Sequence, residues 1–431
     1  MKVIHTKTEL RKLEFDTDII MIPIMSSNFL HTVSDKISLL YLFNQDLKDE
    51  YVFVFNHQEY HSSITAQDLP KFNNIYTLDK KQLIQLDIKA DNIINCNLKD
   101  INLLTTPAHN FYNRKYYNYS KTNQLIPVYK HYEIFKKIKN RINKKIGTCS
   151  VNEFYNDLVL DNLARIEQNG LFVDRKLFIN KYGLDSKKYI SKDDLVYTQY
   201  NINTATNRPS NRFGGINYAA LNSKDCTRKV FQSRFKNKGV LLEFDYSSYH
   251  LYLVASLINY KFPENMTAHE FLATKYFKTD SPTKEQIAEG KTFSFRLMYG
   301  HMIEEYKNIE FFQKVESFIS GLWEDYNINH YIELPLSEKR ITDVDTRDKL
   351  FNYYIQGYET ERNAVITKTL LDLLVGHKSK LILYVYDAFV IDYCMDDGKK
   401  LIKEIKKVIS SKEFPARIKY GVNYKDLKQL K

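Results

Sequence analysis

The sequence predicts a mixed α/β or α+β protein built from roughly two to four structural units, given its length. Its 431 residues allow units with substantial cores, and the hydrophobic content of 43% is ordinary for a globular chain. Strand-like and helix-like stretches alternate in blocks, which indicates a mixed sheet with helices packed against it. The sequence has no internal repeat and no long Gly/Ser linker.

The chain carries the marks of a protein kept inside a cell. Its first residues, MKVIHTKTELRKLEF, do not form a signal peptide, and no apolar run is long enough to cross a bilayer. The cysteines are scattered without C-x-x-C spacing, which argues against a zinc site and against a disulfide framework. We therefore expect a cytoplasmic protein, in its own cell or in a host cell, with no membrane partner.

The formal net charge of +11 suits a polyanionic partner, because lysines and arginines near phosphates release counterions. Many basic proteins bind no nucleic acid, so charge alone leaves that partner open.

The elements follow in order along the chain. Three strand-like runs come first, DIIMIPIM (18–25), KISLLYLF (36–43) and EYVFVF (50–55), and a basic helix is predicted at 128–145. The lysines of that helix form either a solvated face or a nucleic-acid contact. Residues 150–174 predict an amphipathic helix that ends at Gly170 and leads into a strand. A helix-rich block at 259–349, a hairpin at 381–393 and a mixed tail complete the chain.

Two aspartates stand at the ends of predicted strands. Asp245 lies where the strand-like part of LLEFDYSSYHLYLVASL (241–257) gives way to a helix, so it either caps the helix or binds a metal. Asp387 lies at the predicted hairpin tip in KSKLILYVYDAFVIDYC (378–394), between apolar and aromatic neighbours. If the two strands are neighbours, these carboxylates could hold two divalent ions about 3.5–4 Å apart, the spacing used in phosphoryl transfer.

A third candidate is the helix predicted in TKEQIAEGKTFSFRLMYG (283–300). Lys291, Phe295 and Tyr299 recur every four residues and so share one helix face, with Lys284 one or two turns earlier on the same face. A cation beside two rings could hold a triphosphate while the rings flank a base or sugar. The alternative is a core-facing aromatic stripe with a lysine that reaches solvent. Gly300 ends the helix in either case.

A polar loop at 201–231, rich in Asn, Thr, Ser and Gly, carries Arg208, Arg212 and Arg228. Such a composition suits contacts to a nucleic-acid backbone, and it is also common in surface loops.

Taken in order, these segments resemble the family A DNA polymerases, the bacterial polymerase I type, over roughly residues 160–431. DYSSYHL is similar to motif A, which implies that Asp245 and the carbonyl of Tyr246 bind metal, and YVYDAFVID is similar to motif C, which implies the same for Asp387. The 283–300 segment resembles motif B, the nucleotide-binding helix of the fingers, at Lys291, Phe295, Tyr299 and Gly300.

Shorter flanking segments add to the resemblance. TATNRPSN resembles a primer-binding signature with Arg208 in the arginine position, and NYYIQG resembles a segment whose Asn352 and Gln356 contact template and primer. LARIEQNGLFVD resembles the helix that leads into the palm. We place Arg228 on the same primer/template surface. The resemblance implies a DNA polymerase that uses two Mg²⁺ or Mn²⁺ ions, dNTPs and primer–template DNA.

The chain departs from the family pattern at three places. Ile287 replaces the arginine that usually precedes the motif B lysine by four residues, and Lys284 could supply that charge. His250 replaces the glutamate that helps to exclude ribonucleotides, so we count it among the nucleotide-binding residues with sugar choice left open. The motif C acid after Asp387 is Ala388, and Glu243, on the same strand face as Asp245, could replace it.

The expected architecture is a right-hand palm and fingers with a reduced thumb, preceded by a degenerate RNase H-like 3′–5′ exonuclease domain. The expected divisions are 1–145 for the exonuclease-like domain, 146–258 for the first part of the palm, 259–349 for the fingers and 350–431 for the rest of the palm. Residues 175–200 leave room only for a thumb stub, which predicts low processivity unless a partner protein supplies the grip. The first acidic exonuclease motif falls on MIPIMSSNF, which has no acid, and Asp100 is the single plausible survivor. We therefore expect no proofreading.

Three functions remain open at this point. The leading one is a template-directed DNA polymerase from a compact replicon such as a phage or another mobile element. The second is a polymerase with relaxed sugar choice, similar to a primase or an RNA polymerase, and His250 is the residue that favours it. The third is an inactive nucleic-acid-binding subunit, which the retention of both Asp245 and Asp387 argues against.

Overall fold

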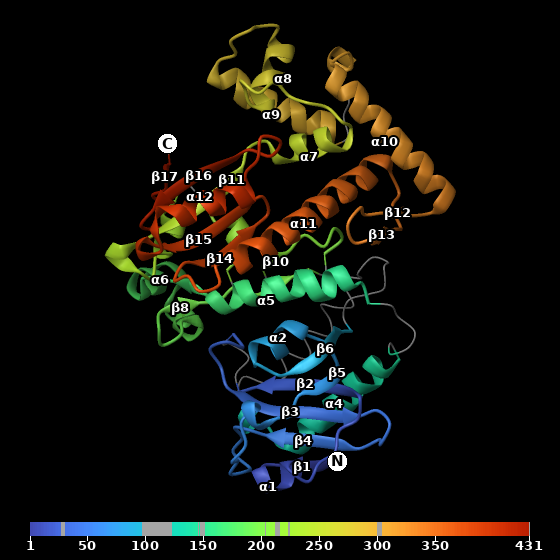
Figure 1. Cartoon of the computed structure of the whole chain (residues 1–431), viewed down its shortest axis with the longest axis vertical. Coiled ribbons are helices and arrows are strands. Elements are labelled where there is room, and N and C mark those ends of the chain that lie inside the picture. The colour runs from blue at the N-terminus through green and yellow to red at the C-terminus, as the bar shows by residue number, and fades with distance from the viewer. Residues whose placement is uncertain are drawn as a thin grey trace. The chain divides into compact units, whose positions relative to one another are not determined.

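The structure, a computed structural model, describes residues 1–26, 31–96, 123–144, 146, 151–202, 204–211, 216–222, 225–299 and 304–430 (Figure 1). The chain divides into two compact units, Met1–Asn203 with Asn211–Arg234, and Thr204–Ser210 with Phe235–Lys431. This two-way division is coarser than the four expected domains, which stay a prediction. No helix within the described ranges is both long and apolar enough to span a membrane.

The first unit is built on a six-stranded mixed sheet in the order β1-β4-β3-β2-β5-β6. Strands β2, β3 and β4 pair antiparallel, whereas β1 with β4, β2 with β5 and β5 with β6 pair parallel. The strands are β1 Lys2–Ile4, β2 Asp18–Met25, β3 Ile37–Asn44, β4 Glu50–Val54, β5 Phe72–Thr77 and β6 Ala90–Asn95. The three strand-like runs of the sequence are therefore confirmed as β2, β3 and β4.

Both faces of this sheet are covered, which explains why its central strands are apolar at nearly every position. Every residue of β3 is buried. Helix α4 (Val128–Asn143) covers one face with Phe135, Ile138 and Ile142, and Figure 1 shows it beside β2, β3 and β4. The basic helix expected at 128–145 is thus confirmed, with its apolar side packed on the sheet.

The remainder of the first unit is made of short elements. Helix α5 (Leu160–Asn169) continues a π-helical segment, Phe154–Val159, and packs against α2 (Lys80–Gln85). It ends at Gly170, whose φ of +59° only glycine adopts without strain, so the predicted helix end is confirmed. Strand β7 (Leu171–Phe172), helix α6 (Arg175–Tyr182), a 3₁₀ segment Leu184–Tyr189 and strand β8 (Leu195–Val196) follow.

The second unit contains a five-stranded antiparallel sheet in the order β14-β15-β11-β16-β17. Its strands are β11 Gly239–Tyr246, β14 Lys380–Val385, β15 Ala388–Cys394, β16 Ala416–Gly421 and β17 Lys428–Gln429. The predicted hairpin is confirmed as β14 and β15. The tail, expected only to be of mixed structure, supplies β16, whose charged and apolar residues alternate because it has one exposed face. Strand β11 therefore has a hydrogen-bonded neighbour on each side, β15 on one and β16 on the other.

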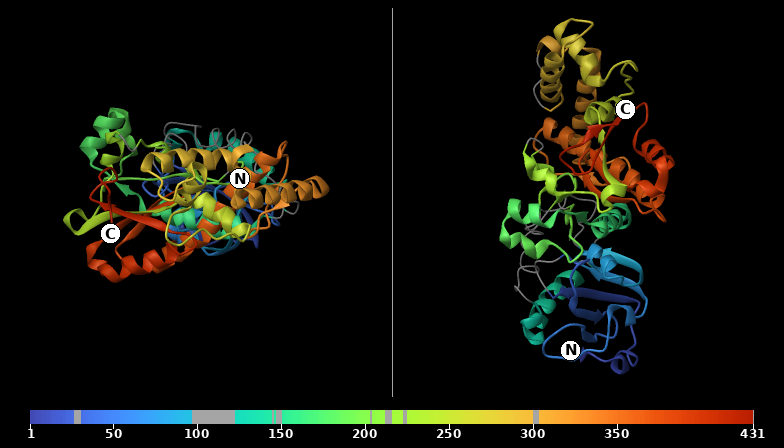
Figure 2. Two further views of the ribbon diagram at one scale, coloured as in Figure 1. Left: turned by 90° about the horizontal axis from the view of Figure 1, so that it is seen from above. Right: turned by 90° about the vertical axis from the view of Figure 1, so that its left-hand side faces the viewer.

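The helices of this unit form their own core beside the sheet. They are α7 Tyr249–Leu257, α8 Ala268–Phe277, α9 Lys284–Met298, α10 Glu310–Asn329, α11 Arg347–Leu373 and α12 Gly398–Ile409. Leu272, Leu297, Phe311 and Ile355 belong to one apolar cluster that joins α8, α9, α10 and α11. Figure 2 shows α8, α9 and α10 grouped together from two further directions, and α11 packs against both α10 and β14. The helix-rich block expected at 259–349 is confirmed.

Candidate active site

The structure brings Asp245 and Asp387 together. Strands β11 and β15 are antiparallel neighbours, and their register sets Asp245 opposite Ala388, the residue that follows Asp387. The backbone N–H of Tyr246 donates to the carbonyl of Asp387 at 3.2 Å. The two aspartates therefore lie side by side at the same end of two paired strands. This arrangement is the condition under which they could share a site.

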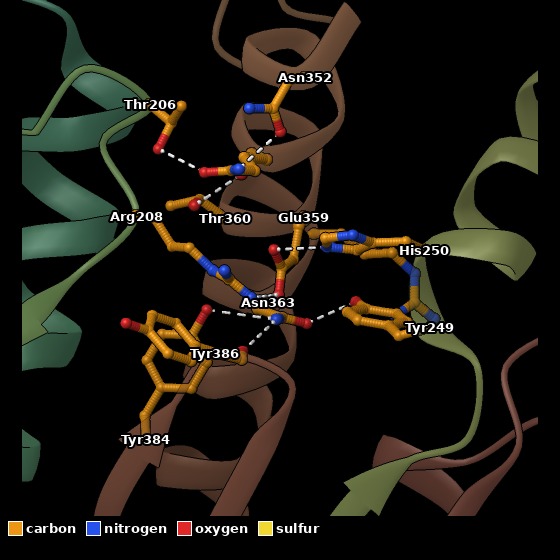
Figure 3. Close-up of polar contacts among 12 residues, drawn as sticks. Thr206, Arg208, Tyr249, His250, Asn352, Glu359, Thr360, Asn363, Tyr384 and Tyr386 are labelled. Atoms are coloured by element: carbon orange, nitrogen blue, oxygen red, sulfur yellow. Dashed lines mark hydrogen bonds and ion pairs between the residues drawn. The ribbon is translucent and has the colours of Figure 1, made fainter. Parts of the chain in front are cut away.

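An unusual backbone conformation near the end of each strand orients the side chains of Asp245 and Asp387. Ser248, between β11 and α7, has a φ of +55°, and Tyr386, in the two-residue turn between β14 and β15, also has a φ of +55°. A residue other than glycine rarely adopts this conformation unless its surroundings hold it there. Asn363 of α11 does so at the hairpin, where its Nδ2 donates to the carbonyl of Tyr386 at 3.1 Å (Figure 3).

The aspartates open into a cavity of about 360 Å³ within the second unit. Its wall includes residues of β11, α7, α8, α9 and β16. Its lining includes Arg208, Asp245, Tyr246, His250, His269, Lys291, Phe295, Asp387 and Arg417.

The cavity is lined by two carboxylates, Asp245 and Asp387, and by cationic residues that include Lys291 and Arg417. Burial and the negative charges of Asp245 and Glu359 raise the pKa of Asp387 to about 6. Elsewhere in the lining, burial and the positive charges of Lys291 and Arg417 lower the pKa of His269 to about 4. The Nδ1 atom of His269 is also buried without a hydrogen-bond partner among the described residues. The carboxylates thus favour a cation between them, and the cationic residues favour an anion.

The donor set at the aspartates suits a hard divalent cation. Two carboxylates that repel each other in a partly buried site gain stability when a cation lies between them, which is the condition that the raised pKa of Asp387 reports. No group of three or more His, Cys, Asp or Glu side chains placed to share an ion occurs in the described ranges. Mg²⁺ commonly takes one or two carboxylates and completes its shell with water and substrate phosphates, so two aspartates fit it.

The expected stripe on the 283–300 helix is present in α9. The ammonium of Lys291 lies 5.9 Å from the centre of the Phe295 ring, and the rings of Phe295 and Tyr299 are stacked 6.3 Å apart. Lys291 and Phe295 line the cavity, and Phe295 keeps 40% of its surface exposed. The exposed Lys284 does not line the cavity, and Gly300 lies outside the described residues.

Arg208 reaches the same cavity from the segment 204–210. Its Nη2 donates to Oε1 of Glu359 at 2.9 Å, and its guanidinium lies 3.8 Å from the centre of the Tyr386 ring. The Nε atom of Arg208 is buried without a hydrogen-bond partner in the part of the chain that the structure describes. A ligand beside Tyr386 could therefore accept from this arginine.

The two polar residues expected to contact template and primer lie one turn apart on α11. Nε2 of Gln356 donates to Oδ1 of Asn352 at 2.7 Å, and the hydroxyl of Thr206 donates to Oε1 of Gln356 at 3.1 Å (Figure 3). Arg228 belongs to the other compact unit, where its guanidinium donates to the carbonyl of Leu221 at 3.0 and 3.1 Å. It is not part of this constellation. Arg212 and Asp100 lie outside the described residues.

Glu243, which could replace the missing motif C acid, is paired with a lysine in this structure. Its side chain does share a strand face with Asp245, and Lys419 contacts both, at 2.7 Å from Glu243 Oε1 and 3.4 Å from Asp245 Oδ2. However, Glu243 is 6% exposed and does not line the cavity. Its carboxylate forms an ion pair with Lys419 of β16.

Three residues of the site were missed by the sequence reasoning: Glu359, His269 and Arg417. Glu359 had a detectable signal, because it continues the row Phe351–Ile355 at a spacing of four on a buried helix face. A carboxylate on such a face needs partners, and its partners turn out to be Arg208 and His250. His269 and Arg417 had no comparable signal, because only the packing of α8 and β16 brings them to the cavity.

No protein-family model and no curated protein matches the sequence. A search of solved structures finds the POL domain of Pol1 from M. smegmatis, in a complex with DNA primer–template and dNTP. The two share 13% sequence identity with a TM-score of 0.71, over 99% of this chain and 100% of that one. The chain therefore has the fold of a DNA polymerase domain along its whole length.

Proposed function

We propose that this protein is a template-directed DNA polymerase that adds dNTPs to a primer 3′ end by two-metal nucleotidyl transfer. The observation that carries the proposal is the pairing of Asp245 with Asp387 in a cavity whose lining also includes Lys291 and Phe295. The likeness to a polymerase domain solved with primer–template and dNTP supports it.

In this proposal Asp245, Asp387 and the carbonyl of Tyr246 hold the metal ions. Divalent ions bound there would lower the pKa of the primer hydroxyl and neutralise charge on the phosphates. Asp387 must be ionised to serve, and its pKa of about 6 means that it is ionised at neutral pH.

The nucleotide would lie between the aspartates and α9. Lys291, with Arg417 nearby, supplies positive charge for the triphosphate, and the exposed face of Phe295 supplies a surface for the base. Arg417 is a better source of the second cation than Lys284, because Arg417 lines the cavity and Lys284 does not.

The primer and template would lie along Arg208, Asn352 and Gln356. All three are polar, lie in the second unit and belong to the network around α11. Arg228, in the first unit, is proposed by itself as a contact to a DNA backbone.

We further propose that the sheet of the first unit is a degenerate exonuclease domain that does not proofread. The β2 segment supports this, because its interior from Ile19 to Met25 is apolar and buried and its one acid, Asp18, accepts a hydrogen bond from Asn74 at 2.7 Å.

Primer extension with Mg²⁺ and dNTPs tests the polymerase proposal. We expect the wild-type protein to extend a primer, and Asp245→Asn or Asp387→Asn to abolish incorporation while thermal unfolding shows an intact fold. Asp396→Asn is the matched control, because it makes the same change at the exposed far end of β15, where Asp396 pairs with Lys378. Full activity in either active-site variant would contradict the proposal. DNA binding without extension by the wild type would favour an inactive subunit.

A further inference from the structure

Asn363 is a buried side chain of α11 whose oxygen and nitrogen are both hydrogen-bonded. It is 0% exposed. Its Oδ1 accepts from the hydroxyl of Tyr249 at 2.6 Å, and its Nδ2 donates to the carbonyl of Tyr386 at 3.1 Å and to the hydroxyl of Tyr384 at 3.2 Å (Figure 3). A single side chain therefore joins the start of α7 to the turn between β14 and β15.

Two of these partners lie on the short segments that carry the proposed metal ligands. Tyr249 is four residues after Asp245, and Tyr386 directly precedes Asp387. The carbonyl of Tyr386 belongs to the same planar peptide group as the N–H of Asp387, so a hydrogen bond to this carbonyl fixes the backbone from which the Asp387 side chain departs. The φ of +55° at Tyr386 persists only where its surroundings hold it, and Asn363 is part of those surroundings.

The Tyr249 end of this link is anchored in the core. Nη1 of Arg362 donates to the hydroxyl of Tyr249 at 2.8 Å, so this hydroxyl keeps its own hydrogen for Asn363. The guanidinium of Arg362 lies 3.6 Å from the centre of the Phe414 ring, and the rings of Tyr246 and Tyr249 are stacked with their centres 4.1 Å apart. The Tyr249 hydroxyl is therefore a fixed point to which Asn363 ties the hairpin turn.

Asn363 also continues a row of polar residues along α11. The spacing of four, three and four residues places the members on one face of the helix: Asn352, Gln356, Glu359 and Asn363. The first three contact one another or residues that line the cavity. Asn363 extends the row to the strand ends that carry the aspartates.

The carboxylates of Asp245 and Asp387 repel each other when no ion lies between them, so their separation depends on what ties their segments together. We propose that Asn363 is a positioning residue that keeps these two segments at the separation a divalent ion needs, and thereby raises the affinity of the site for that ion. The inference rests on the proposed polymerase function and deepens it, because it assigns control of metal affinity to a residue that does not itself line the cavity. Removing a group that orients metal ligands typically weakens metal binding by about 10–100-fold.

Direct binding of Mn²⁺ tests the inference without DNA or nucleotide. The paramagnetic resonance signal of the free ion gives the dissociation constant at a fixed temperature, and the site is recognised by its loss in Asp387→Asn. We expect the constant of Asn363→Ala to be about tenfold higher than that of wild type, because the two aspartates are no longer tied together. A merely structural role for Asn363 predicts a lower melting temperature with an unchanged constant, and that result would overturn the inference.

Asn156→Ala is the matched control. Asn156 is 5% exposed in the first unit, where it accepts from the backbone N–H of Asn95 at 2.9 Å and donates to the carbonyl of Ile93 at 3.0 Å. It supports β6 as Asn363 supports the hairpin turn, but it does not line the cavity. We expect Asn156→Ala to lower the melting temperature and to keep the wild-type Mn²⁺ constant. An equal rise of the constant in both variants would show a general loosening of the protein and refute the inference.

Two tyrosine variants cover the case in which Asn363→Ala does not fold. Tyr249→Phe removes the hydroxyl that anchors Asn363 and should raise the Mn²⁺ constant severalfold. Tyr384→Phe removes the other partner of Nδ2, leaves the two segments joined and should keep the wild-type value. In a folded double variant, Tyr249→Phe should add nothing to Asn363→Ala, because both changes break the same link. An unchanged constant in Tyr249→Phe, or additive increases in the double variant, would contradict the inference.

Primer extension separates this inference from the proposed function. In Asn363→Ala we expect the apparent KM for Mg²⁺ to rise about tenfold, while the KM for dNTPs at saturating Mg²⁺ stays at the wild-type value. A wild-type protein that extends primers, together with an Asn363→Ala variant that binds Mn²⁺ as wild type does, overturns the inference and leaves the polymerase function standing. A wild-type protein that incorporates no nucleotide overturns the function and the inference with it.

Discussion

Asp387 is a carboxyl at a proposed metal site whose ionisation lowers the stability of the folded state. Its position beside Asp245 in a partly buried site disfavours its charge, which raises its pKa to about 6. Moving the pKa of a carboxyl from about 4 to about 6 means that its ionisation costs the folded state up to about 3 kcal/mol. The carboxylates of Asp245 and Asp387 therefore repel each other in the metal-free site, and a bound divalent ion would relieve this repulsion.

This repulsion predicts a pH dependence of stability in metal-free protein. Below about pH 4 the carboxyl is protonated in both the folded and the unfolded state, so it has no effect. As pH rises from 4 to 6, the unfolded chain ionises first and the folded state loses stability, and above pH 6 the full penalty is present. Thermal unfolding should therefore show Asp387→Asn to be more stable than wild type at pH 8, with the difference vanishing near pH 4.

Magnesium should act on the same group. At pH 8 we expect Mg²⁺ to raise the melting temperature of wild type and to have a much smaller effect on Asp387→Asn, because the variant lacks both the charge and one ligand. An equal rise in both proteins would show that the ion binds elsewhere.

At the scale of elements, the packing of α8 against α9 places the proposed nucleotide-binding face. A Cβ atom on Gly290 would lie 3.2 Å from Cδ2 of Tyr276 and 3.4 Å from Cβ of Ala273, so the glycine allows the two helices to approach. The hydroxyl groups of Tyr276 and Ser294 are 2.9 Å apart and join the helices at the next turn. Lys291 and Phe295 stand on the helix that this contact fixes.

Gly290→Leu should therefore separate α8 from α9. We expect a loss of about 1–3 kcal/mol in unfolding free energy from overpacking, together with a higher KM for dNTPs. Gly321→Leu is the control, because Gly321 lies inside α10 with nothing within 4 Å of its would-be Cβ. There the same substitution should stabilise the protein by up to about 1 kcal/mol through helix propensity. Chemical denaturation of both variants, with steady-state kinetics, checks this; equal stabilities would refute the close-contact argument.

At the scale of the whole molecule, the net charge and the interval 175–200 bear on how the protein would hold DNA. Its net charge of +11 favours nonspecific attraction to phosphates, which weakens with salt. The interval 175–200, where we expect only a thumb stub, contains α6 with 8 residues, a 3₁₀ segment and the short β8. No long helical pair occurs in that fully described interval.

We accordingly predict low processivity for the protein alone. Extension of a labelled primer in the presence of excess trap DNA should give short products, which shorten further as salt rises toward about 0.2 M. A partner protein that supplies the missing grip would lengthen them. Long products from the isolated protein at that salt concentration would contradict the prediction.

Much of the chemistry was readable along the chain. Asp245, Asp387, Lys291 and Phe295 are local signals, because each is a polar or aromatic residue at a fixed place in a strand end or a helix stripe. Their strands and helices formed where the periodicity of apolar residues predicted them. The hairpin needed only a turn between two apolar runs, so the position of Asp387 at its tip followed as well.

What the sequence alone determined is thus the set of elements and the residues that each one presents, because side-chain periodicity and turn chemistry are local properties. Only the tertiary structure decided that Asp245 and Asp387 share a cavity, that Lys291 and Arg417 line the same cavity, and that Glu359 joins Arg208 to His250. These contacts join positions that are more than a hundred residues apart. They depend on strand order, strand register and helix packing, which no local pattern encodes.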